Sequence, residues 1–107
     1  MTDACIILTS CGSEETAETI AEALVDQALA ASVTILPNAR TYFALEGTTR
    51  WEDEYQVLAT TTRDRFEAAA QVIKRLHTYK VPGILMLEVA QGSREALAWI
   101  RTLGRLD

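Results

Sequence analysis

The chain has 107 residues, of which 49% are hydrophobic and 23% charged, and its formal net charge is −5. This length suits one domain, which we expect to span residues 1–107, and the composition excludes a disordered or low-complexity chain. The acidic balance argues against nucleic acid as a partner, because binding to phosphates depends on basic side chains that displace counterions.

The sequence also predicts a location in the cell. No apolar run approaches the roughly 18 residues that a membrane helix needs, so no membrane partner is expected. The first residues lack the basic start of a signal peptide, which favours the cytoplasm. Cys5 and Cys11 lie on one expected strand and would be roughly 20 Å apart, too far for a disulfide. We therefore expect two free thiols in a reducing compartment.

The first third of the chain predicts a strand followed by a helix. Residues 4–10 form a short apolar run that ends in Cys11-Gly12-Ser13, as expected of a buried strand followed by a turn. Ser13 can cap the free N–H groups of a helix, and the two acids after it suit the positive end of the helix dipole. Apolar residues then recur at helical spacing as far as Ala28.

The middle of the chain predicts extended structure. Residues 32–36 are rich in β-branched side chains, and we expect this strand to stop at Pro37-Asn38. Residues 40–45 and 50–62 are further extended stretches, parted by Glu46-Gly47. They predict one long hairpin.

A second helix and a last strand are expected after the hairpin. Asp64 and Glu67 have the spacing of a capping box, and the helix that follows should end near His77. Residues 84–89 read as a strand. Ser93 then opens a short terminal helix for which Gly104 is the expected stop.

This order predicts an α+β chain with a ferredoxin-like βαββαβ sandwich and an added C-terminal helix. Such a sheet has helices on one face only, and in a domain of this size the other face needs a cover. We expect Tyr42, Phe43, Trp51 and Tyr55 to lie there against partner subunits, so the sequence predicts a homo-oligomer.

Several segments resemble one known family in register along almost the whole chain. They are Ile6–Ser10, Leu29–Pro37, the hairpin around Gly47, His77–Pro82, Leu87–Gly92 and Leu97–Ile100. On these segments the chain is similar to the CutA divalent-cation tolerance proteins. The resemblance implies a tight homotrimer built like the PII signalling proteins, with hairpin strands exchanged between neighbouring sheets. It also implies a non-enzymatic role in copper and divalent-metal tolerance, with a metal ion or small ligand at the clefts between subunits.

The chain departs from the family pattern at positions that the family places near its site. A first-strand cysteine linked to copper corresponds to Thr9, and a second family cysteine corresponds to Ser32. The aromatic pair before the hairpin glycine appears as Phe43 and Leu45. A Glu, a Lys, a second Glu and a Tyr of the family correspond to Tyr55, Thr61, Gly83 and Ala96. The resemblance therefore implies a divergent member that has kept the scaffold better than the site.

Cys11 and His77 are the candidate metal ligands, with Cu(II) or another divalent cation as the candidate cofactor. His77 is the only histidine, and a histidine at a helix C-terminus is also favoured by the helix dipole whatever its function. A structural zinc site needs about four Cys or His ligands, so any site here must recruit carboxylates or a second subunit.

Two further features have a functional and a structural interpretation. Cys11 precedes a helix start, where the helix dipole would lower the thiol pKa; the alternative is a small turn residue covered by the helix. Glu52, Asp53 and Glu54 could bind a hard cation, but strand residues alternate in direction, so a solvated acidic edge is the favoured interpretation.

Three classes of function remain open besides the CutA type. A small ferredoxin-fold enzyme is one, although no nucleophile–base pairing is evident from the spacing. An RNA-recognition domain is disfavoured by the acidic charge. The last is a structural trimer that serves as a platform for a partner protein.

Overall fold

The computed structural model describes residues 2–105 and has the expected α+β architecture. The elements are β1 (Ala4–Cys11), α1 (Glu14–Asp26), β2 (Ser32–Leu45), β3 (Thr48–Thr62), a 3-10 turn (Arg63–Arg65), α2 (Phe66–Leu76), β4 (Leu85–Glu88) and α3 (Arg94–Arg101). The strands form one antiparallel sheet in the order β2-β3-β1-β4, which is the ferredoxin-like order. The predicted fold class is confirmed.

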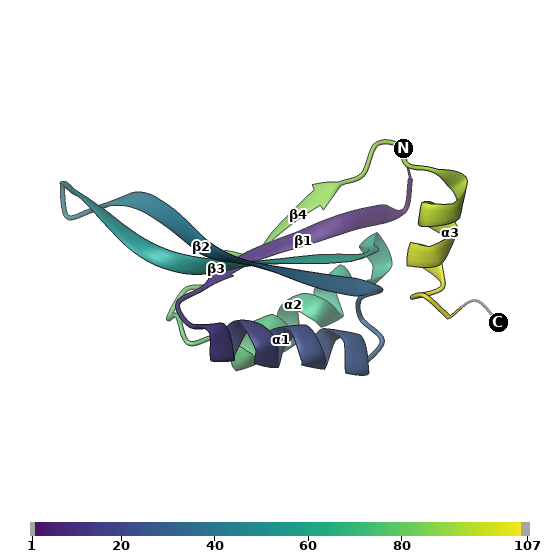
Figure 1. Cartoon of the computed structure of the whole chain (residues 1–107), viewed down its shortest axis with the longest axis horizontal. Coiled ribbons are helices and arrows are strands. Elements are labelled where there is room, and N and C mark those ends of the chain that lie inside the picture. Colours follow the sequence, from purple (N-terminus) through teal and green to yellow (C-terminus); the bar gives the residue numbers. More distant parts are fainter. Residues whose placement is uncertain (1, 106–107) are drawn as a thin grey trace.

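The layers are simple (Figure 1). Helices α1 and α2 cover one face of the sheet, and α3 lies at the end opposite the tip of the β2–β3 hairpin. The hairpin runs well beyond the rest of the sheet, so the described part of the chain measures 50 × 26 × 23 Å. Within residues 2–105, no helix has the length and apolar character to cross a membrane.

The hydrophobic core lies between the sheet and the two covering helices. Ile7 of β1 and Val57 of β3 meet Ile20 and Leu24 of α1 and Ile73 of α2, and all five are at most 1% exposed. The strand residues alternate, so each second side chain enters this core. The predicted helical spacing therefore places the correct faces of α1 and α2 inward.

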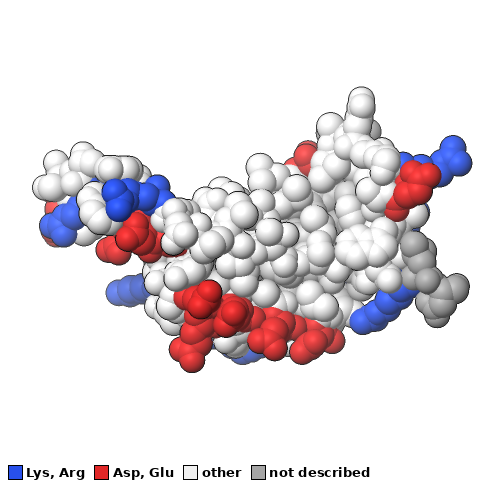
Figure 2. Space-filling view, viewed as in Figure 1, with Lys and Arg blue, Asp and Glu red and all other residues white. Residues whose placement is uncertain are grey.

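The other face of the sheet, which we call the bare face, is apolar and carries no helix. Leu8 of β1 lies between Leu58 of β3 and Leu85 of β4, while Ile6 lies beside Leu87. Leu85 is 61% exposed and Leu87 is 48% exposed. In Figure 2 the side of the body away from α1 and α2 carries few charges, whereas acids line the lower edge along α1.

The prediction of which aromatic side chains lie on the bare face is partly wrong. Tyr55 alternates with the core residue Val57 and packs against the core instead. Tyr42 pairs with Trp51, and the side chains of both point to the same side of the sheet as Tyr55. They therefore lie on the hairpin face opposite the bare face. Of the four aromatic residues, only Phe43 has the parity of the bare face.

Two boundaries also differ from the expectation. Strand β2 does not stop at Pro37-Asn38 but passes through a bulge between Leu36 and Ala39, where Asn38 has φ 61°. An edge strand tolerates this, because proline removes a donor that only an inner strand needs and asparagine accepts the left-handed conformation.

The start of α2 lacks the expected capping box. The carboxylate of Asp64 accepts a hydrogen bond from the hydroxyl of Thr62, and residues 63–65 form the 3-10 turn, so α2 begins at Phe66 without a side-chain cap. By contrast, Ser13 and Ser93 accept bonds from the N–H groups of Thr16 and Ala96, as expected of caps.

Candidate functional site

The chemistry-bearing side chains gather where the end of β1 meets the end of α2. Cys11 closes β1, His77 follows the last residue of α2, and Tyr79 lies in the loop that leads to β4. Glu54 comes from the middle of the hairpin. The structure thus brings together both predicted metal ligands, a glutamate of the acidic run and Tyr79, to which the sequence analysis assigned no role.

The ring of His77 links the end of β1 to the loop after α2 by hydrogen bonds. Its Nδ1 accepts a hydrogen bond from the N–H of Tyr79 at 3.1 Å, so the neutral ring carries its proton on Nε2, which donates to the carbonyl of Ser10 at 2.9 Å. The residue is 9% exposed. Both ring nitrogens therefore serve backbone groups, and this favours the structural interpretation of a histidine at a helix end.

Cys11 lies beside this ring, with its Sγ 3.9 Å from Nε2 of His77. Burial, and to a smaller extent the charge of Glu54, raises the pKa of the Cys11 thiol to about 11. The helix dipole does not lower it, so the interpretation of Cys11 as a reactive thiol is wrong. Burial dominates because this side chain is 0% exposed.

The pair Cys11–His77 stays a predicted metal site. Among residues 2–105 there is no group of three or more His, Cys, Asp and Glu side chains that could hold a metal ion. A metal ion bound by Cys11 and His77 would have to displace the proton of the thiol. It would also have to break the hydrogen bond between His77 and the carbonyl of Ser10. Further ligands would have to come from another subunit, which is one of the two sources that the sequence left open beside carboxylates.

Glu54 departs from the expectation of a solvated acidic edge. It is only 8% exposed, and its Oε2 accepts a hydrogen bond from the hydroxyl of Tyr79 at 2.5 Å. Burial, this bond and the charge of Glu54 all raise the pKa of the Tyr79 hydroxyl. The phenol therefore stays protonated and keeps donating to the carboxylate.

Gly12 makes room for this contact. A Cβ atom at Gly12 would lie 3.3 Å from the hydroxyl oxygen of Tyr79, closer than most real contacts. The Tyr79 ring also lies beside His77, with 4.7 Å between the ring centroids. The Tyr79 ring is thus held between β1 and the end of α2 and reaches Glu54.

A cavity of about 710 Å³ opens beside this pair. Its apolar wall includes Leu8, Phe43, Val81 and Leu85. Its polar wall includes Glu52, Glu54 and Tyr79. The strand register gives Glu52, Glu54 and Phe43 the parity of the bare face, so this cavity, which we call the hairpin cavity, lies on that side of the sheet.

Two positions at which the chain departs from the resemblance, Thr9 and Thr61, are buried inside the subunit, and a third, Ser32, is half-buried. Thr9 is 2% exposed, and its hydroxyl is buried without a partner among the described residues. Ser32 shares a hydrogen bond of 2.8 Å with Thr60. Thr61 donates to the carbonyl of Leu29 at 2.7 Å. The hydroxyls of Ser32 and Thr61 serve hydrogen bonds within the chain, whereas Thr9 is among the residues that line the hairpin cavity.

The remaining departures lie elsewhere. Tyr55 packs against the core, and Leu45 and Ala96 are exposed on the hairpin and on α3. Phe43 and Gly83 line the hairpin cavity. Together with Thr9, three of the departing positions therefore line the cavity where a ligand could enter.

Comparison with known proteins agrees with this architecture. The family of the CutA1 divalent ion tolerance protein matches residues 5–103. The chain is 40% identical, over 96 residues, to the divalent-cation tolerance protein CutA of Thermus thermophilus, and this covers 90% of the chain and 93% of the relative. The chain belongs to the CutA1 family.

Solved CutA structures superpose closely on the chain. CutA from Xylella fastidiosa matches with a TM-score of 0.91 at 33% identity, and the match covers 95% of this chain and 98% of that protein. A protein of Archaeoglobus fulgidus, described as a periplasmic divalent cation tolerance protein CutA, matches with a TM-score of 0.89 at 29% identity over 95% of this chain and 99% of its own. The predicted family and the ferredoxin-like fold are therefore confirmed.

Sequence reasoning missed the Tyr79–Glu54 pair. The signal for Glu54 was its strand parity with Leu58, which separates it from its exposed neighbour Asp53. The signal for Tyr79 was weaker, because nothing in a loop sequence says that its ring will fold over a glycine.

Proposed function

We propose that this chain acts in divalent-cation tolerance as a non-enzymatic trimer that binds a metal ion or a small ligand at its subunit clefts. Membership of the CutA1 family over residues 5–103 is the observation that carries the proposal. The relatives are themselves named for divalent-cation tolerance.

The bare face supports assembly. Leucines from all four strands lie on it, and Leu36, Leu85 and Leu87 are each between 45% and 61% exposed. A contiguous apolar patch of this kind on a small domain is typical of a subunit interface. The arrangement we propose is a homotrimer similar in build to the PII proteins.

The hairpin supports the same arrangement. Strand β1 pairs with β3 only between Tyr55 and Thr62, so residues 48–54 of β3 pair with β2 alone. A two-stranded ribbon is marginally stable in water on its own. A ribbon that extends this far (Figure 1) is well suited to pairing with a neighbouring subunit's sheet.

The metal we propose is Cu(II) or another divalent cation, with Cys11 and His77 as ligands. Loss of the thiol proton would give a soft ligand for copper, and rotation of the His77 ring away from Ser10 would free Nε2. The affinity should be micromolar or weaker, because both changes cost native interactions.

The protein is also proposed to work in the cytoplasm. Both thiols are buried and free in the part of the chain that the structure describes, which suits a reducing compartment.

A non-enzymatic role agrees with the state of the one Cys–His pair. The thiol is protonated, and the proton on Nε2 points to a carbonyl, so His77 does not act as a base toward Cys11.

A second candidate function is a structural platform for a partner protein. Thr61 favours it, because its hydroxyl is buried and donates to the carbonyl of Leu29, which leaves that family position with no group to offer a ligand.

The test measures solution mass and the thermal midpoint together, with and without Cu(II) and Zn(II). A trimer whose midpoint rises with a metal is the expected result, since binding to the native state stabilises it. Calorimetric titration should show Cu(II) binding that is lost in Cys11→Ala combined with His77→Gln and kept in Cys5→Ala, which removes the other buried thiol. Equal titrations of all three proteins would remove the ligand assignment, and a trimer indifferent to metals would favour the platform.

A further inference from the structure

The hairpin cavity holds a buried carboxylate that no cation neutralises. Glu54 is 8% exposed, and its hydrogen-bond partner within residues 2–105 is the neutral hydroxyl of Tyr79. The ion pairs in that range join Arg40 to Asp53 and Arg63 to Asp3 and Glu88, and none involves Glu54. A buried charge without a partner of opposite sign is costly, so this site is poised for a positive group.

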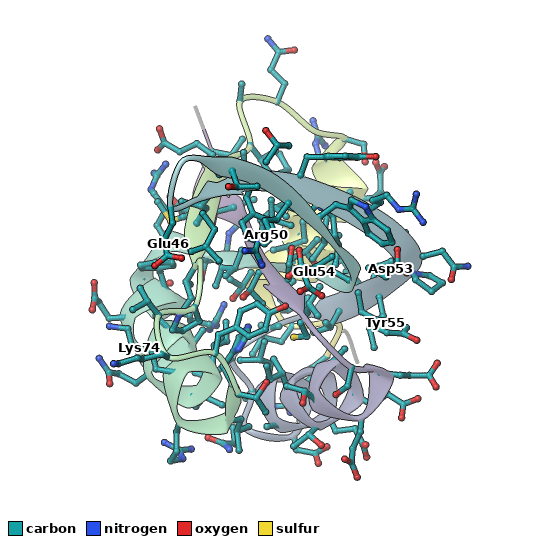
Figure 3. All side chains as sticks on the ribbon, turned by 90° about the vertical axis from the view of Figure 1, so that its left-hand side faces the viewer. Glu46, Arg50, Asp53, Glu54, Tyr55 and Lys74 are labelled. Atoms are coloured by element: carbon teal, nitrogen blue, oxygen red, sulfur yellow. The ribbon has the colours of Figure 1, made fainter. Side chains whose placement is uncertain are left out.

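The strand alternation brings a second carboxylate to the same place. Glu52 and Glu54 both line the hairpin cavity, whereas Asp53 between them points to the other side of the ribbon. Arg50 has the same parity as Glu52 and Glu54, so it lies on the same side of the ribbon, farther out along the hairpin that points toward the viewer in Figure 3. No ion pair joins Arg50 to either glutamate in the described structure.

The apolar residues that line the hairpin cavity indicate which kind of cation fits it. Phe43, Val81 and Leu85 face the same cavity and offer no ligand atoms to a metal. Two carboxylates alone fall short of the six or more oxygens that calcium takes and of the octahedral shell of magnesium. An ion that also carries an apolar body would satisfy both walls at once.

We propose that the hairpin cavity binds a small organic ammonium ion, a primary amine whose charged head meets Glu54 and Glu52 and whose apolar body lies against Phe43, Val81 and Leu85. Tyr79 holds one oxygen of Glu54 in place and leaves the other for the ligand. This inference rests on the proposed small-ligand role of the protein, with the hairpin cavity as the part of a subunit cleft that stays open after assembly. It names the ligand's chemistry and does not involve the Cys11–His77 pair.

The test uses three probes of one shape and different charge: 2-phenylethylammonium, 2-phenylethanol and phenylacetate. Calorimetric titration of the full chain should show that the ammonium binds more tightly than the alcohol and that phenylacetate does not bind. Glu54→Gln should weaken binding of the ammonium about tenfold or more, because an amide loses the charge-assisted bond. Asp53→Asn is the matched control, since it removes the same charge one residue away on the other side, and it should leave the affinity unchanged.

Each alternative outcome is distinct. Equal affinity for the ammonium and the alcohol, or equal losses in Glu54→Gln and Asp53→Asn, would overturn the proposal. If no probe binds and Glu54→Gln lowers the solution mass, a basic side chain of a second copy fills the cavity, which also overturns it. Should Glu54→Gln fail to fold, Glu52→Gln gives the same test with a smaller loss of affinity expected.

Cu(II) titration of the same samples separates the proposed amine site from the proposed metal site. A Cu(II) response that stays intact without amine binding overturns only the amine proposal.

Discussion

The two faces of the sheet are both apolar, yet the chain covers only one of them. On β1, Ile7 enters the core and is 1% exposed, while its neighbour Ile6 lies on the bare face beside Leu87. Two helices are enough for one face of a four-stranded sheet, and the third helix lies at its end (Figure 1). The difference indicates that the strands of this protein specify two apolar contacts, one made within the chain and one made outside it.

The largest expected effect tests the covered face. Ile7→Ala should lower the free energy of unfolding by about 2–5 kcal/mol, because it leaves a cavity among well-packed neighbours. Ile6→Ala removes the same atoms one residue away and should cost clearly less in a Leu87→Asp background, which keeps subunits apart, since Ile6 is only partly buried in the subunit. Urea unfolding of both variants in that background measures this. Equal losses there would mean that the subunit itself buries both faces equally.

The next effect tests the bare face. Leu87→Asp puts a charge on the apolar patch and should lower the solution mass while the subunit stays folded, because a charge is not tolerated in an apolar interface. Val25→Asp is the control, since Val25 is similarly exposed, at 42%, but lies on α1. Light scattering together with circular dichroism measures both. An unchanged mass for Leu87→Asp would contradict the idea that the bare face is an interface.

Much of the covered face could be predicted from the sequence. Helical spacing located α1 and α2, and serine caps located the starts of α1 and α3, because these are local signals. The start of α2 was missed because Asp64 had a closer partner in Thr62 than the N–H groups it was expected to cap. Strand β2 was cut short because a bulge around Pro37-Asn38 looks like a strand end in a sequence.

The site was less predictable than the fold. Cys11 and His77 are indeed neighbours, as two elements that end at the same side of the sheet can be, but their protonation depends on burial and on carbonyls that the sequence does not show. The acidic run was expected to be solvated as a whole. Alternation separates Glu54 from Asp53, and the decisive partner, Tyr79, is 25 residues away along the chain.

A moderate effect should appear at alkaline pH on the covered face. The pKa of the Cys11 thiol is raised from 9.0 to about 11 in the folded state. Between these values the unfolded chain has lost this proton and the folded chain still holds it, so stability falls as pH rises. We expect a loss on the order of 2 kcal/mol between pH 9 and pH 11, measured by urea unfolding at several pH values.

The matched variant for this effect is Cys11→Ala, which should have a lower stability at neutral pH but a shallower alkaline decline. Tyr79→Phe separates the contribution of the phenol, whose pKa is also raised and therefore acts in the same direction above its ordinary value of 10.0. A decline that stays equally steep without the Cys11 thiol would show that other groups cause it.

The smallest effect is expected on the hairpin, where neither face is covered by the chain. The guanidinium of Arg40 lies 4.0 Å from the ring centre of Trp51 and its Nε is 3.4 Å from Asp53. The side chains of Arg40 and Asp53 are 52% and 68% exposed, so water screens the ion pair. Arg40→Ala should therefore lower the free energy of unfolding by no more than about 1 kcal/mol, measured by urea unfolding. Asp53→Asn should lower it less still, because it leaves the stacking of Arg40 on Trp51 intact.

A loss above about 2 kcal/mol for Arg40→Ala would mean that a second subunit shields this cluster from water, since only a desolvated pair contributes that much. In that case the outer half of the hairpin would be a buried surface like the bare face, and the contact made outside the chain would extend from Leu87 to Trp51.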